Sequence, residues 1–191
     1  MRLSESDSKL LGRCIEELEA RTEAEVVLVL RPRSGHYRDV SYLVGAASAF
    51  FLLCFFLYSP FEFPPYAIPL PIIAAFTTMG WVSQHSSLRR WLTRARRRRQ
   101  QVETDARAAF VERKIHTTGK GIGILLYCSR LERDAVILPD LGAAARLDPA
   151  KLEEFRQALA KAWAERHPAA PLGEVLRRLG VYLGHAMPWD E

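Results

Sequence analysis

Two long stretches without a charged residue lie close together in an otherwise polar chain, at residues 42–59 and 66–82. At 1.5 Å per residue, helices of 18 and 17 residues reach about 27 and 26 Å, close to the roughly 30 Å hydrocarbon core of a bilayer. A pair of buried helices in a soluble protein is the alternative, but such helices normally keep a polar stripe. Neither stretch has one, so the pattern predicts two membrane-spanning helices.

The connector between the two stretches, residues 60–65, contains three prolines and one carboxylate, Glu62. Prolines stop helix propagation, and a charged side chain is costly in lipid. The connector therefore predicts the tip of a helical hairpin. Pro69 and Pro71 fall near the start of the second helix, where a proline removes few backbone hydrogen bonds.

The segments on either side of the hairpin carry helix and strand patterns. Apolar residues at helical spacing predict amphipathic helices over about 5–20, from Val102 to about Ile115, after the capping residue Asp148, and over about 171–186. Glu103 is expected to pair with Arg107 four residues later. Continuous apolar runs predict buried strands at residues 26–30, 122–128 and 135–139.

The strand at residues 26–30 precedes the hairpin, whereas the other two follow it. A single strand cannot bury both of its apolar faces alone, so all three are expected to share one sheet. The fold class expected is therefore α/β (α+β): a small mixed sheet flanked by helices, with an inserted two-helix transmembrane hairpin. The chain then divides into residues 1–40, the hairpin 41–83, a basic segment 84–100, and residues 101–191.

Charge is concentrated in one segment. The chain has 27 Lys and Arg against 22 Asp and Glu, and a pI near 9.3. Residues 89–99 contain seven arginines and no acid, so the rest of the chain holds 20 basic and 22 acidic residues. A nucleic-acid patch would need interleaved stacking aromatics, and only Trp91 lies here, so anionic lipid is the expected partner. The arginines expected to contact lipid are Arg89, Arg90, Arg94, Arg96, Arg97, Arg98 and Arg99.

Basic residues flank both outer ends of the hairpin. Arg31, Arg33 and Arg38 precede the first stretch, and the arginine-rich segment follows the second. Basic loops stay on the cytoplasmic side of a membrane. We therefore expect a two-pass protein of the plasma (inner) membrane with both termini in the cytoplasm.

Five stretches, in this order around a two-helix insertion, resemble the TPM domain family, particularly its short membrane-embedded bacterial members. They are 18–27 (LEARTEAEVV), 34–40 (SGHYRDV), 109–113 (AFVER), 121–129 (GIGILLYCS) and 131–142 (LERDAVILPDLG). The resemblance covers nearly the whole chain. It implies a mixed sheet flanked by helices and a role as an accessory or assembly factor for membrane complexes. It also implies divalent-cation binding at an acidic edge in some members and a proposed phosphatase activity in others.

The acidic candidates for such a cation site are Glu132, Asp134 and Asp140, which flank the third predicted strand. Carboxylates at strand ends that converge would suit Ca²⁺ or Mg²⁺, which prefer oxygen ligands. Arg130 and Arg133 lie among them and either repel a cation or pair with the carboxylates. A charged turn with local ion pairs is therefore the alternative to a metal site.

Motifs for nucleophilic or nucleotide chemistry are weak. The glycines at 119–123 follow a predicted helix and open a strand, the reverse of a phosphate-binding loop. The five histidines never pair at three- or four-residue spacing, and Ser34 and His36 lie in a short lead into a membrane helix. The sequence thus favours a binding or accessory module for a membrane component, without a resident cofactor. The alternative is a divalent-metal-assisted phosphatase on the same fold.

Overall fold

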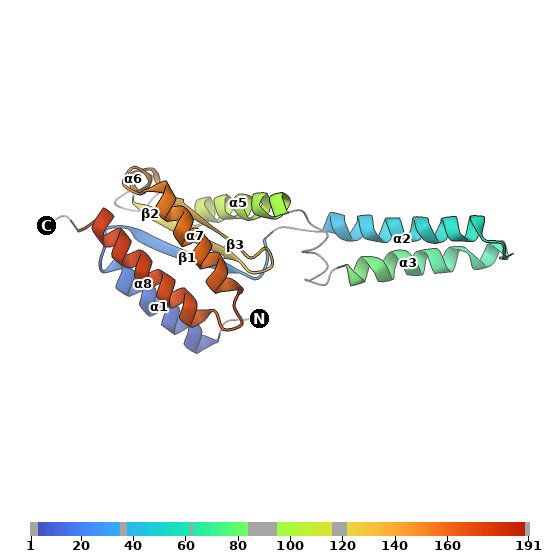
Figure 1. Cartoon of the computed structure of the whole chain (residues 1–191), viewed down its shortest axis with the longest axis horizontal. Helices are drawn as coiled ribbons and strands as arrows, with labels where there is room; N and C mark the ends of the chain where they lie inside the picture. The colour runs from blue at the N-terminus through green and yellow to red at the C-terminus, as the bar shows by residue number, and fades with distance from the viewer. Residues whose placement is uncertain (1–3, 35–37, 62, 84–94, 116–121, 190–191) are drawn as a thin grey trace. The chain divides into compact units, whose positions relative to one another are not determined.

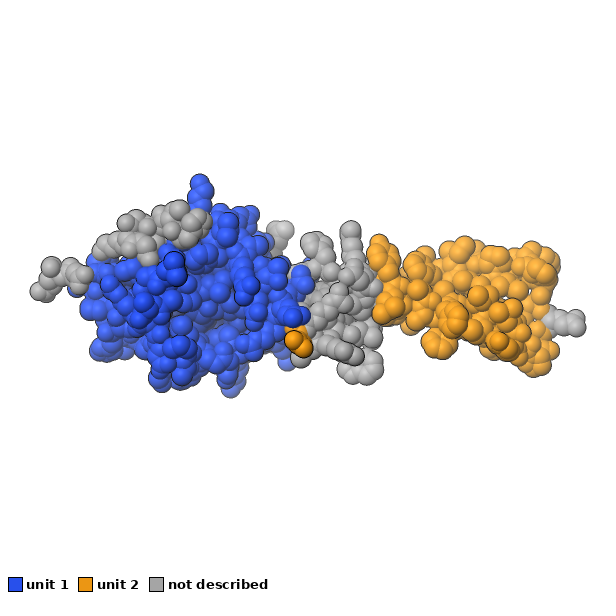
Figure 2. Space-filling view, turned by 90° about the horizontal axis from the view of Figure 1, so that it is seen from above, with its two compact units in different colours: residues 1–34, 98–191 blue, residues 35–97 orange. Residues whose placement is uncertain are grey.

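The computed structural model describes residues 4–34, 38–61, 63–83, 95–115 and 122–189 (Figure 1). The chain forms two compact units, one made of residues 1–34 with 98–191 and the other of residues 35–97. Figure 2 colours these units separately. The first unit is discontinuous in sequence, as expected for a domain that carries an insertion.

A three-stranded mixed sheet forms the centre of the first unit. Its strands β1 (Glu25–Arg31), β2 (Gly123–Ser129) and β3 (Asp134–Pro139) follow the spatial order β1-β2-β3. β1 pairs with β2 in parallel, from Glu25 opposite Gly123 to Arg31 opposite Ser129, and β2 pairs with β3 antiparallel. The expectation that strands before and after the hairpin share one sheet is confirmed.

Three helices cover one face of this sheet: α1 (Glu5–Glu19), α7 (Pro149–Ala164) and α8 (Ala169–Ala186) (Figure 1). Their apolar stripes pack against alternate residues of the strands, because successive strand side chains point to opposite faces. Burying each leucine contributes about 1.5–3 kcal/mol relative to leaving it exposed. Fully buried leucines of this core include Leu18, Leu126, Leu159, Leu172, Leu176 and Leu183.

The opposite face is covered by the helix α5 (Ala95–Glu112) (Figure 1). Val102, Ala106 and Ala109 of this helix are buried against a second core that includes Leu125 and Tyr127 of β2. β2 is buried along its whole length, as its uninterrupted apolar run predicts. The unit is therefore a three-layer arrangement of helices, sheet and helix.

Most helices of the first unit begin and end close to the residues that the sequence pattern predicts. Asp148 accepts a hydrogen bond from the Ala150 N–H at 2.9 Å, with Pro149 in the first turn of α7. Two details differ. α5 begins inside the arginine-rich segment, and Glu103 pairs with Arg99 at 3.3 Å rather than with Arg107. Position i−4 and position i+4 are equally close on a helix, so spacing alone does not choose between them.

The second unit is an antiparallel helical hairpin. It consists of α2 (Arg38–Tyr58), the 3₁₀ turn η1 (Pro65–Ala67) and α3 (Pro69–Val82). The second apolar stretch is thus not one helix. It opens with η1, and α3 starts with Pro69 in its first turn, where the missing N–H costs no helical hydrogen bond.

The two helices of the hairpin approach closely at Gly45. A Cβ atom at Gly45 would lie 2.8 Å from the backbone oxygen of Phe76 on α3. The Ser48 hydroxyl donates to Gly45 O at 2.8 Å and also reaches Ala75 O at 3.2 Å across the pair. Small residues and hydroxyl side chains at a helix contact are typical of packing within membranes.

Gly45→Ala should loosen this contact, because the atom in the way is backbone and cannot rotate aside. We expect a loss of about 1–3 kcal/mol of hairpin stability, as for other overpacked sites. The measurement is the thermal unfolding midpoint of the full chain in detergent. Gly80→Ala is the matched control, since its Cβ would lie 3.5 Å from Ser41 O, an ordinary contact. Equal midpoints for the two variants would contradict the packing described.

Candidate functional site

The hairpin exposes most of the large apolar side chains that lie on the surface. Of the 21 large hydrophobic residues exposed in the described part of the chain, 16 lie between residues 42 and 82. Ser41–Tyr58 and Pro65–Val82 have mean hydropathies of 1.9 and 1.3, and only 11% and 0% of these windows are buried. A core helix of a soluble protein is mostly buried. By length and composition these two windows could cross a membrane, and neither hydrophobic core of the described residues includes a side chain from them.

Aromatic residues with polar tips mark both ends of the hairpin. Its tyrosines and tryptophan are Tyr42, Tyr58, Tyr66 and Trp81, and all four are exposed, from 61% to 87%. Tyr58 and Tyr66 flank the tip, whereas Tyr42 and Trp81 lie at the open end. Tyr and Trp concentrate at the two interfaces of a bilayer. Tyr42 and Tyr58 are sixteen residue steps apart, a helical rise of about 24 Å, which fits that spacing.

A buried polar network fixes the chain where it leaves the α/β unit. The Ser34 N–H donates to both carboxylate oxygens of Glu132 at 3.2 Å, and the Ser129 hydroxyl donates to the same carboxylate. The hydroxyls of Ser34 and Tyr127 share a hydrogen bond of 2.9 Å. All four residues are buried. Such a network is favourable only while every member is paired, so it holds the exit of the chain in one place.

The structure places the three acidic candidates in separate surroundings. Glu132 belongs to the buried network just described. Asp134 pairs with Arg156 and also accepts from the Ala135 N–H at 2.9 Å. Asp140 begins the four-residue helix α6 (Leu141–Ala144), accepting from the Leu141 N–H at 2.7 Å. Asp134 and Asp140 lie at opposite ends of β3, about 20 Å apart along the strand. The structure therefore does not bring the three carboxylates together.

Arg156 joins α7 to the start of β3. Its guanidinium contacts Asp134 and also holds Glu153 at 2.6 Å. Hydrogen bonds from Arg156, and then from Gln157, lower the pKa of Glu153 from 4.5 to about 2. Sequence reasoning expected the arginines beside the turn, Arg130 and Arg133, to neutralise these acids. The partner of Asp134 instead comes from a helix 22 residues further along the chain.

The arginine-rich segment is described only at its end. Arg89, Arg90 and Arg94 lie outside the described residues, as does the side chain of Arg97. In the first turns of α5, Arg96 and Arg99 are exposed and Arg98 is half-buried. Arg99 pairs with Glu103 on the same helix.

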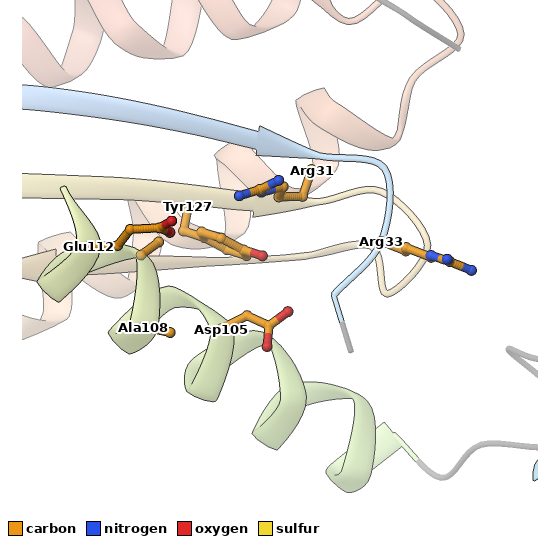
Figure 3. Close-up of a pocket in the computed structure, with 7 residues that line it drawn as sticks. Arg31, Arg33, Asp105, Ala108, Glu112 and Tyr127 are labelled. Atoms are coloured by element: carbon orange, nitrogen blue, oxygen red, sulfur yellow. The ribbon is translucent and has the colours of Figure 1, made fainter. Parts of the chain in front are cut away.

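A cavity that the sequence analysis missed opens between β1, β2 and α5. Its volume is about 210 Å³, and it lies wholly within the α/β unit (Figure 3). Arg31 and Arg33 come from the end of β1 and the segment after it, and Tyr127 comes from β2. The remaining lining residues are on α5: Asp105, Ala108, Ala109 and Glu112. No motif links these positions in the sequence, because three separate elements bring them together.

Tyr127 is the inner polar group of this cavity. Burial raises the pKa of its phenol above the ordinary value of 10.0. The hydrogen bond to Ser34 opposes that rise, and the charges of Asp105 and Arg31 act in opposite directions on it. The phenol therefore stays protonated at neutral pH. The hydroxyls of Tyr127 and Ser34 share one buried hydrogen bond, in which either oxygen can be the donor.

Comparisons with known proteins agree with the fold. The chain is similar in structure to the BA42 protein of the psychrophilic bacterium Bizionia argentinensis, whose structure was determined by NMR. The TM-score is 0.58 at 14% identity, and the match covers 100% of this chain and 88% of the other. No family model and no curated protein matches the chain. The likeness shows a mixed α/β fold.

The ion pair between Arg156 and Glu153 predicts how the stability of the fold depends on pH. A carboxyl group whose pKa is lower in the folded than in the unfolded state stabilises the fold at pH values above the unfolded-state pKa. That stabilisation is lost as the pH falls through the folded-state pKa. Glu153→Gln should therefore lower the unfolding midpoint at pH 7, and the difference from wild type should shrink between pH 4.5 and about 2. The measurement is thermal unfolding at pH 7 and pH 3.

The exposed residue Glu16 on α1 is the matched control. Glu16→Gln should leave the midpoint nearly unchanged at both pH values. A Glu153→Gln difference that is as large at pH 3 as at pH 7 would refute the assigned ion pair.

Proposed function

We propose that the chain is a two-pass integral protein of the plasma (inner) membrane that serves as an accessory or binding module for another membrane component. The observation that carries the membrane assignment is the hairpin. It combines two helical spans without a charged residue, Ser41–Tyr58 and Pro65–Val82, with exposed apolar side chains and aromatic residues at both ends. A patch of this size in water would be an aggregation hazard, whereas a bilayer covers it.

The proposed orientation puts both termini in the cytoplasm. Its support is the distribution of charge, since arginines flank both outer ends of the hairpin and the connector carries none. The parallel pairing of β1 with β2 supports the same arrangement, because the two strands lie on either side of the hairpin in sequence. Strands that share a sheet must lie on the same side of the membrane.

The segment 89–99 would then meet the cytoplasmic leaflet. Each basic residue near an anionic surface contributes about 1 kcal/mol, and salt weakens this attraction. Arg96 and Arg99 are exposed at the start of α5, in accord with such a contact. The partners proposed are thus anionic lipids and another membrane protein or complex, as the resemblance to the TPM family implies.

A binding role is favoured over a metal-assisted phosphatase by the surroundings of the acidic residues. A hydrolytic site would need carboxylates that converge on one open position. Glu132 and Asp134 are engaged by neighbouring protein groups, and Asp140 lies at the other end of β3. The phosphatase remains the alternative, and its signature would be metal-dependent hydrolysis that Asp140→Asn abolishes.

The topology is tested by single cysteines in a chain whose Cys14, Cys54 and Cys128 are replaced by alanine. Phe61→Cys, 70% exposed at the tip of the hairpin, should react with a membrane-impermeant thiol reagent on intact cells. Ser8→Cys, exposed on α1, should react only after the membrane is opened. The measurement is the mass shift of the chain on a gel.

Circular dichroism of each purified variant controls for folding. Labelling of Ser8→Cys but not Phe61→Cys on intact cells would invert the proposed topology. Labelling of neither on intact cells, with both reacting in opened cells, would show that the tip does not cross the membrane.

A further inference from the structure

The turn between β2 and β3 folds over the segment that follows β1. Its Arg130 N–H donates to Arg31 O at 3.1 Å. Its Leu131 N–H donates to Pro32 O at the same distance. These backbone hydrogen bonds continue the contact between the two strands beyond the sheet. The segment after β1 is therefore fixed in place, and its residue Arg33 with it.

The end of α7 lies at the same place. The Trp163 indole N–H donates to Arg31 O at 3.3 Å. The Arg130 guanidinium donates to Glu165 O at 3.1 Å, and it lies 5.7 Å from the centre of the Trp163 ring, a cation–π contact. Figure 1 shows that α5 also begins at this end of the unit. We call the surface formed by residues 31–33, 130–133 and 165–167 the turn end of the α/β unit.

The exposed charges at the turn end are mostly positive. Arg33, Arg133 and Arg166 are exposed. Within the part of the chain that the structure describes, none of these three arginines forms an ion pair. Figure 3 shows the Arg33 side chain pointing outward, in the direction opposite to that of Arg31. The guanidinium of Arg33 is therefore presented to the surroundings of the unit.

The acidic groups near the turn end are buried or paired. Glu132 is 5% exposed and accepts from the Ser34 N–H. Asp134 pairs with Arg156. Among the turn-end residues, all of which the structure describes, Glu165 is the one exposed acid. The turn end therefore presents a surface of net positive charge.

Arg133 has a backbone conformation that suits a different residue. Its φ is 50°, in the left-handed region. This region is unfavourable for residues other than glycine and, to a lesser extent, asparagine and aspartate. The Arg133 side chain is exposed and belongs to neither hydrophobic core. Packing thus gives no reason for an arginine here, and strained residues of this kind cluster at binding surfaces.

We propose that the turn end docks on the anionic surface of the membrane through the guanidinium groups of Arg33, Arg133 and Arg166. Guanidinium groups donate charge-assisted hydrogen bonds to phosphate oxygens, and basic residues are attracted to anionic head groups. The inference rests on the proposed membrane function and extends it from segment 89–99 to the α/β unit itself.

The connectivity of the chain favours a membrane over a nucleic acid as the partner of this surface. The chain leaves the α/β unit after Ser34 and re-enters it at Arg98. Ser34 is bonded to the β2–β3 turn through Glu132, and α5 begins at the turn end. A hairpin that spans a bilayer therefore keeps the turn end, rather than the opposite end of the sheet, close to the head groups.

The test uses the full chain in nanodiscs of phosphatidylglycerol or of phosphatidylcholine, with the three native cysteines replaced by alanine. His167→Cys carries a fluorescent thiol label at the turn end, and Ala145→Cys carries it at the opposite end, after α6. The label at residue 167 should be shielded from the neutral quencher acrylamide in phosphatidylglycerol discs relative to phosphatidylcholine discs. The label at residue 145 should be quenched equally in both. Salt at about 1 M, where the Debye length is about 3 Å, should remove the difference.

A double variant separates docking from anchoring by the hairpin. Each arginine near an anionic surface contributes about fivefold to the ratio of docked to undocked chains, so Arg33→Gln with Arg133→Asn should lower that ratio by about 25-fold. Shielding of the label at residue 167 should then be lost. The matched control, Arg21→Gln with Arg113→Gln, removes two exposed arginines that precede β1 and follow α5, at the opposite end of the unit. It should keep the shielding, and an equal loss in both double variants would refute a local docking surface.

Single variants of Arg133 show whether the fold or the membrane accounts for this arginine. Asparagine adopts a positive φ more readily than arginine, so Arg133→Asn should have an unfolding midpoint in detergent at or above that of wild type. Arg133→Lys keeps the charge and should keep the shielding. A lower midpoint in Arg133→Asn together with unchanged shielding would assign Arg133 to the fold and contradict its role in docking.

Insertion and docking are measured separately. Co-elution of the chain with the discs in gel filtration reports insertion of the hairpin. Inserted chains that are quenched equally in the two kinds of disc would overturn the docking and leave the proposed membrane function standing. Chains that enter neither kind of disc would overturn both. Shielding by a short RNA in phosphatidylcholine discs, without an effect of phosphatidylglycerol, would assign the turn end to a nucleic acid and refute the proposal.

Discussion

The parallel pairing of β1 with β2 is the constraint on which the rest of the molecule depends. β1 precedes the hairpin and β2 follows it, yet they are aligned residue by residue over seven positions. β2 is buried along its whole length, so its two faces and both neighbours must be present at once. A hairpin inserted between two such strands has to begin and end on the same side of any membrane it crosses. The sheet of the first unit thus requires both ends of the hairpin to lie on one side of such a membrane.

The buried network at Ser34 and the cavity beside it share Tyr127. Its ring belongs to the core between the sheet and α5. Its hydroxyl shares a hydrogen bond with Ser34, the last residue of the α/β unit before the second unit begins at residue 35. Glu132 holds that same residue through its backbone N–H. Tyr127 therefore stabilises the chain exit through its hydroxyl and lines the cavity with its ring. Replacing Tyr127 would therefore change the chain exit and the cavity lining together.

The fold was largely predictable, because it depends on patterns that are local in sequence. The apolar run at residues 122–128 and the cap at Asp148 define their elements without reference to distant residues. The helix α6 was missed, since four residues are too few to show a period. The partner of Asp134 and the cavity were missed for another reason. Arg156 and Glu112 reach these places through tertiary packing, and no spacing in the sequence records which distant side chains a fold brings together.

The central claim is that the α/β unit closes on itself around an inserted helical hairpin, which we propose to be a membrane anchor. Its most direct test is a chain in which residues 35–97 are replaced by a flexible glycine-serine linker of about ten residues, long enough to span roughly 18 Å. The account predicts that this chain leaves the membrane fraction, stays soluble, and unfolds in one cooperative thermal transition measured by circular dichroism. A chain that remains in the membrane pellet after a high-salt wash, or that is soluble but shows no cooperative transition, would contradict it.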